Sequence, residues 1–173
     1  PFESGGGQGL SSVGTYVTCI SLRDVTARRL YETKLEEMSR VDDLTGLLTR
    51  RGLVDAMAKV GTGFSVFVID LHRFSHLNET LGREKGDGVL KAVAARLRRH
   101  AGIDGLSARL AGDTLCLATP GVEDEAGLAE SAEHLLALFD TPFGVDGIKI
   151  ELNARVGACS GSLGLGDPGQ WIE

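Results

Sequence analysis

Arg109-Leu110-Ala111-Gly112-Asp113-Thr114-Leu115 is the stretch that decides how this chain folds. It is a short turn with one glycine and one carboxylate, and it lies between two apolar runs, Leu106 to Leu110 and Thr114 to Ala118. That length and the glycine predict a β-hairpin. A second acid, Asp70, ends another apolar run that begins at Phe64. If the runs form adjacent strands, Asp70 and Asp113 lie together and indicate a divalent-metal site, although acids of this kind are also typical of ordinary turns.

Composition favours one domain with a small appendage. The chain has 173 residues, of which 42% are hydrophobic, and a net charge of -6. It contains no Lys/Arg-rich block, which argues against a nucleic-acid partner. No run approaches the roughly 18 apolar residues of a membrane span, so we expect no membrane segment here, while an anchor elsewhere in a longer protein is left open. Three widely spaced cysteines, Cys19, Cys116 and Cys159, indicate reduced core thiols and a cytoplasmic protein.

The first forty residues read as a separate segment. Alternation from Thr15 to Leu22 predicts a β-strand. A helix then follows to about Arg40, with a narrow apolar stripe. A lone strand is not stable by itself, and a narrow stripe favours a partner helix. We therefore expect the end of an upstream domain and a connector that pairs in a homodimer. A helix folded back on its own domain is the alternative.

The remainder alternates between helices and strands. The patterns predict helices at Arg51 to Val60, Gly88 to His100 and Glu123 to Phe139, and strands at Phe64 to Asp70, Ile148 to Leu152 and Ala154 to Cys159, besides the hairpin. The last two strands are expected around a second turn. The predicted fold class is α+β, an antiparallel-rich sheet with helices on its faces.

Three stretches resemble, in order and at family spacing, the motifs of GGDEF domains, the diguanylate cyclase family. Asp42 to Arg51, DDLTGLLTRR, resembles D-x-L-T-G-L-x-N-R, with Thr49 in place of the Asn. Asp70 to Asp87 resembles D-I-D-x-F-K-x-I-N-D-x-x-G-H-x-x-G-D without a gap. Ala111 to Leu115 falls where the motif that names the family belongs. The resemblance covers Asp42 to Cys159 and implies a nucleotidyl-cyclase-like, ferredoxin-like palm.

The resemblance also implies a reaction and its site. GGDEF domains condense two GTP molecules to cyclic di-GMP, one per subunit of a dimer, with Mg²⁺ or Mn²⁺. The family's metal ligands match Asp70, the backbone carbonyl of Leu71, and Asp113. Its phosphate loop matches His72, Arg73, Phe74 and Ser75, and its guanine-reading pair matches Asn78 and Asp87.

Some of these residues have plainer interpretations. Asp87 could be the N-cap of the helix expected from Gly88. His72 and His76 are four residues apart, as in some metal sites, but we favour solvated histidines. Arg109 could attract phosphate or form a structural ion pair.

Departures from the family pattern indicate that cyclase activity is lost or vestigial. Thr114 stands where the family has a glutamate required for turnover, so no catalytic residue is assigned. Losing a positioned acid or base costs about 10²- to 10⁴-fold in rate. Ala111 replaces a glycine, His72 replaces an acid, and Ser75 replaces a lysine. We expect a degenerate GGDEF domain that still binds GTP and a metal ion; an active cyclase and a nucleotide-free dimerisation module are the alternatives.

The surrounding sequence suggests a multidomain signalling protein. Residues 1–24 resemble the last strand of a PAS sensor domain or are the edge of the sequence, residues 25–41 form the linker helix, and residues 42–173 form the GGDEF domain. The stretch at 142–147, PFGVDG, resembles one common where an EAL phosphodiesterase domain follows. The family's product-inhibition motif is missing at 102–105, and its final helix, expected after Trp171, is not present.

Overall fold

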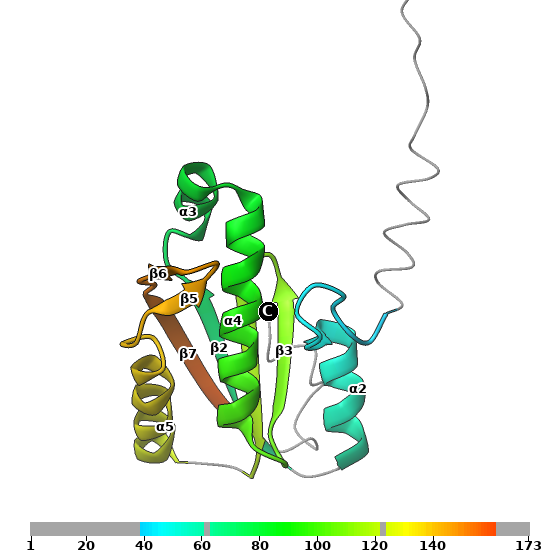
Figure 1. Cartoon of the computed structure of the whole chain (residues 1–173). Helices are drawn as coiled ribbons and strands as arrows, with labels where there is room; N and C mark the ends of the chain where they lie inside the picture. Colours follow the sequence, from blue (N-terminus) through cyan, green and yellow to red (C-terminus); the bar gives the residue numbers. More distant parts are fainter. Residues whose placement is uncertain (1–38, 61–62, 122–123, 162–173) are drawn as a thin grey trace, which may run out of the picture. The chain divides into compact units, whose positions relative to one another are not determined.

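The computed structural model describes residues 39–60, 63–121 and 124–161 (Figure 1). The strand predicted from Thr15, Cys19 within it, the linker helix up to residue 38 and the end of the chain around Trp171 lie outside the described residues. Residues 39–41, which the linker helix was expected to include, are not helical, and Val41 instead forms an isolated bridge with Leu48.

Strand β2 (Phe64–Leu71) is the strand on which the site depends. Its sequence, FSVFVIDL, is rich in β-branched and aromatic residues, and nearly all of it is buried. It pairs antiparallel with β4 (Thr114–Pro120) on one side and with β7 (Ala154–Gly161) on the other. A strand with partners on both sides and cover on both faces has a nearly continuous apolar sequence, as here.

In the part of the chain that the structure describes, the main sheet has five strands in the order β1-β3-β4-β2-β7. β3 (Leu106–Ala111) forms an antiparallel hairpin with β4, and β1 (Leu48–Thr49) runs parallel to β3. Two short strands, β5 (Phe143–Val145) and β6 (Ile148–Ile150), form a separate antiparallel pair. The expected hairpin and the antiparallel-rich α+β fold are therefore confirmed.

Four described helices flank the main sheet (Figure 1). They are α2 (Arg50–Val60), α3 (Phe74–Leu81), α4 (Arg83–Ala101) and α5 (Glu125–Ala137). The Asp124 side chain caps α5 by accepting a hydrogen bond from the Gly127 amide at 2.9 Å.

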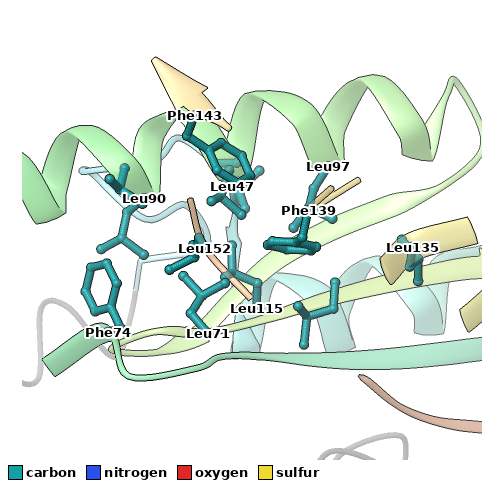
Figure 2. Close-up of a cluster of buried hydrophobic side chains, with 14 of the residues drawn as sticks. Leu47, Leu71, Phe74, Leu90, Leu97, Leu115, Leu135, Phe139, Phe143 and Leu152 are labelled. Atoms are coloured by element: carbon teal, nitrogen blue, oxygen red, sulfur yellow. The ribbon is translucent and has the colours of Figure 1, made fainter. Parts of the chain in front are cut away.

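The two faces of β2 contribute to two separate cores, because successive side chains of a strand point to opposite faces. Phe67, Ile69 and Leu71 face the larger core, which α4 and the end of α5 cover (Figure 2). Phe64 and Val66 face a smaller core built on α2. Each fully buried leucine or phenylalanine contributes about 1.5–3 kcal/mol, so the two cores hold β2 in place between them.

Arg96 fixes the segment between α5 and β5. Its Nη1 donates hydrogen bonds to the carbonyl oxygens of Leu138 and Thr141, the latter at 2.7 Å, and its Nη2 donates to that of Pro142 at 3.2 Å. Its guanidinium also lies 3.7 Å from the centre of the Phe143 ring. One side chain of α4 therefore satisfies three backbone carbonyls of a non-helical turn.

Three expectations about the elements were wrong. α4 begins at Arg83 rather than Gly88, so Asp87 lies inside the helix and is not its N-cap. The glycines at 82, 86 and 88 obscured this first turn in the sequence, because glycine disfavours helix interiors. The strand expected over Ile148 to Leu152 ends at Ile150 and pairs with β5, whereas β7 pairs with β2.

The two described cysteines differ. Cys116 is buried in the smaller core, as expected, and burial raises the pKa of its thiol to about 12. Cys159 is exposed on β7, so the expectation of a core thiol is wrong there. The reason is that α2, which covers the smaller core, packs against β1 and β3. In the strand order, β4 and β2 separate these strands from the edge strand β7.

Candidate functional site

The end of β2 and the β3–β4 turn lie next to each other. Asp70 is the register partner of Thr114, the first residue of β4. The Leu71 amide is 3.4 Å from the backbone oxygen of Asp113. The strands carrying the two acids are thus adjacent, as the sequence indicated, and both acids lie at the same end of the sheet.

An arginine holds the turn in its conformation. Gly112 has a φ of +51°, which favours glycine, and a β-bulge lies between Arg109 and Ala111. Arg109 Nε donates to the Gly112 oxygen at 2.8 Å, and Arg109 Nη1 lies 3.2 Å from Asp42 Oδ2. Of the two interpretations of Arg109, the structure shows the ion pair.

Asp42 connects the first motif to this turn. Besides Arg109, its Oδ1 accepts hydrogen bonds from the amide, at 2.8 Å, and the hydroxyl of Thr45. Burial acts to raise the pKa of Asp42, but the Thr45 hydrogen bonds and the charge of Arg109 outweigh it and lower the pKa below 3.8. The first motif therefore has a structural role, because it supports the turn that carries Asp113.

The loop between β2 and α3 leaves backbone amides available from Arg73 onward, whereas the His72 amide donates to the Asn153 carbonyl oxygen at 2.8 Å. Arg73 precedes α3 in the left-handed conformation, with φ 57° and ψ 30°, and no side chain caps the helix. The amides of a first helical turn lack partners within the helix and attract anions. Phe74 is buried in the larger core and anchors this end of α3, while Ser75 is exposed. The four loop residues thus present an uncapped helix start next to Asp70.

Asn78 and Asp87 come from two different helices that pack together. Asn78 Oδ1 lies so close to Gly86 that a Cβ atom there would come within 1.8 Å of it. Asp87 follows Gly86 in α4 and is exposed. The absence of a side chain at Gly86 therefore allows Asn78 to approach the helix that carries Asp87.

The two histidines do not form a joint site. His76 is exposed, with Nδ1 3.7 Å from a Glu79 carboxylate oxygen, and His72 Nδ1 lies 3.3 Å from Arg155 Nη2. Within residues 39–60, 63–121 and 124–161, no group of three His, Cys, Asp or Glu side chains could hold a metal ion.

Comparison with known proteins identifies the family. The family described as "Diguanylate cyclase, GGDEF domain" matches residues 39–173. The chain belongs to the GGDEF family. Its GGDEF fold is similar to that of a sensory box/GGDEF family protein from Caulobacter crescentus, with a TM-score of 0.64, 27% identity, and coverage of 78% of this chain and 90% of that one.

Two curated relatives are much longer proteins. An uncharacterized signaling protein of Caulobacter vibrioides is 30% identical over 149 residues, covering 82% of this chain and 18% of the relative. The cyclic di-GMP phosphodiesterase NbdA of Pseudomonas aeruginosa is 31% identical over 130 residues, covering 71% of this chain and 16% of the relative. The chain thus spans less than a fifth of the length of these two relatives, and it is a domain of cyclic di-GMP signalling.

GGDEF domains generally use GTP with a metal ion, and the oxygen donors here suit one chemically. Asp70, Asp113 and the Leu71 carbonyl are hard donors of the kind that Mg²⁺ and Mn²⁺ prefer. In the described part of the chain, the carboxylates of Asp70 and Asp113 form no hydrogen bond or ion pair, and both are half-buried. These donor types therefore suit Mg²⁺ or Mn²⁺ chemically, although the two carboxylates are fewer than the three His, Cys, Asp or Glu side chains of a metal-binding group.

Sequence reasoning missed one charged residue beside Asp70. Arg155 on β7 is the register partner of Asp70 on the side opposite Thr114. Nothing near Arg155 in the sequence indicates this, because it depends on the pairing of β7 with β2.

None of the described helices is both long and apolar enough to cross a membrane.

Proposed function

We propose that this GGDEF domain binds GTP with Mg²⁺ or Mn²⁺ and does not convert it to cyclic di-GMP. Asp70, the Leu71 carbonyl and Asp113 would hold the metal ion, which when bound offsets the negative charge of the triphosphate. In the loop from His72 to Ser75, the amides of Arg73, Phe74 and Ser75 at the start of α3 orient the phosphates, while the His72 amide is bonded to the Asn153 carbonyl. The Asp87 carboxylate accepts hydrogen bonds from guanine N1 and N2, and the Asn78 amide donates to O6 or N3.

The observation that carries the proposal is the pairing of Thr114 with Asp70. Thr114 stands at the position of the family's glutamate, where a carboxylate would lie directly beside Asp70. A threonine hydroxyl has no negative charge and does not accept a proton at neutral pH. A site without this acid can keep nucleotide binding and lose the step that activates the attacking hydroxyl, at a cost of about 10²- to 10⁴-fold in rate.

We further propose that GTP occupancy regulates a linked output domain. The relative NbdA is a cyclic di-GMP phosphodiesterase, and the PFGVDG stretch at 142–147 favours an EAL domain after this one. A PAS-like segment at 1–24 and a dimerising linker helix at 25–41 complete the proposed arrangement, in the cytoplasm. Fold resemblance alone does not carry this regulatory role, so it depends on the linked domains.

Two assays on the 173-residue chain test the binding and the turnover separately. Calorimetric titration with GTP and Mg²⁺ should show binding that Asp70→Ala and Asn78→Ala weaken. Asp104→Ala, an exposed acid on the α4–β3 turn, should leave binding unchanged. Incubation with GTP and either metal should yield no cyclic di-GMP.

The outcomes distinguish the alternatives. Robust cyclic di-GMP formation would show an active cyclase in which another residue replaces the glutamate. Absence of GTP binding, or binding indifferent to Asp70→Ala and Asn78→Ala, would favour a dimerisation module without nucleotide.

A further inference from the structure

Three side chains form a row across the end of the sheet. Asp70 on β2 is the register partner of Thr114 on β4 and of Arg155 on β7. Directly paired residues of antiparallel strands project from the same face. Asp70 is therefore flanked by a hydroxyl on one side and by a guanidinium on the other, and all three lie on the face opposite the larger core.

His72 orients this guanidinium without neutralising it. Arg155 Nη2 lies 3.3 Å from His72 Nδ1. A guanidinium can only donate, so in a hydrogen bond between these two nitrogens His72 Nδ1 is the acceptor. A carboxylate at position 72 would cancel the positive charge, whereas an imidazole carries no negative charge to cancel it. Arg155 forms no ion pair with any carboxylate in the described part of the chain.

The formal charges of four side chains at this edge cancel before any ion binds. Asp70 and Asp113 contribute two negative charges, and Arg155 and the exposed Arg73 contribute two positive ones. Arg109 is already paired with Asp42. The uncapped start of α3 adds partial positive charge. A highly charged anion at this loop therefore meets fixed cations of the protein itself.

We propose that Arg155 is a phosphate-binding residue of this domain, a fixed cation beside Asp70 that partly replaces the divalent ion in GTP binding. This role rests on the proposed function, because it takes GTP as the ligand of the site. Arg155 has opposite effects on the affinities of the site for its two ligands. Arg155 attracts the triphosphate, and it repels a divalent cation from Asp70.

Arg155→Gln removes the charge and keeps much of the side-chain size. In EDTA, calorimetry should show GTP binding that Arg155→Gln weakens about tenfold, the effect of losing one charge-assisted hydrogen bond. Guanosine, which has no phosphates, should bind both proteins equally. In the absence of nucleotide, Mn²⁺ titrated by electron paramagnetic resonance should bind Arg155→Gln more tightly than the parent protein. Arg99→Gln, an exposed arginine on α4, is the matched control and should change neither affinity.

The results separate this role from the proposed function. If GTP binds with Mg²⁺ but Arg155→Gln changes neither GTP affinity in EDTA nor Mn²⁺ affinity, the role of Arg155 is refuted and GTP binding stands. If GTP binding is absent in EDTA and present only with a divalent ion, the partial replacement of that ion is also refuted. If neither GTP nor guanosine binds under any condition, the proposed function fails and the role of Arg155 fails with it.

Discussion

The ion pair between Asp42 and Arg109 should contribute measurably to stability, because it is largely shielded from water. The two side chains are 22% and 16% exposed, and the closest nitrogen and oxygen are 3.2 Å apart. Exposed ion pairs contribute about 0.2–1 kcal/mol, whereas hydrogen bonds to charged groups contribute about 1.5–3 kcal/mol. We expect a coupling free energy of about 1.5 kcal/mol from a double-mutant cycle of Asp42→Asn and Arg109→Met.

The assay is urea unfolding of the four proteins in the cycle. The chain contains its own control, since Arg40 and Asp55 form an ion pair of 2.7 Å in which the side chains are 61% and 34% exposed. The equivalent cycle on that pair should give less than about 0.5 kcal/mol. A coupling at Asp42 and Arg109 below about 0.3 kcal/mol, or no larger than that of the control, would refute the idea that the first motif supports the hairpin turn.

Further predictions concern pH, the nucleotide and the core. Because the pKa of Asp42 is lowered below 3.8 in the folded protein, its carboxylate stabilises the fold fully above that value. This contribution is lost as the pH falls through the folded pKa, so the free energy of unfolding should drop more steeply below about pH 4 in the parent protein than in Asp42→Asn. Gly86→Ala should displace the Asn78 amide and weaken GTP binding about tenfold, seen by calorimetry, whereas Gly144→Ala, where a Cβ atom meets open space, should leave binding unchanged. Arg96→Met should lower the free energy of unfolding by about 2–3 kcal/mol, measured in urea, because it leaves backbone carbonyls of the segment after α5 without their donor.

Local sequence patterns predicted the elements on which the site is built. The hairpin followed from a glycine turn between two apolar runs, and β2 from a buried β-branched run. The first turn of α4 was missed because glycines at 86 and 88 are poor helix formers in isolation. In the fold their small size is required, since a Cβ at Gly86 would meet Asn78 and one at Gly88 would meet Val145. Tertiary contacts thus overrode local propensity.

Long-range pairing was beyond what the sequence could predict. β5 and β6 are only three residues each, too short to show a pattern, and β6 was assigned to the wrong partner. Which residue of β7 lies beside Asp70 depends on the register between β2 and β7, two strands that lie far apart in the sequence. Register is decided by which faces are buried, and a run such as Ala154 to Gly161 alone does not reveal it.

The substitutions at the end of the sheet are best understood together. A divalent ion is held by several negative charges, and the motif resemblance places Thr114 and His72 where the family has acids. Arg155 alters that balance, since it adds a positive charge beside Asp70 on the strand opposite Thr114, and His72 orients it without cancelling it. On the function proposed above, the row Thr114-Asp70-Arg155 would keep an anionic nucleotide without the acids that turnover needs, and that is the charge pattern expected of a GTP sensor.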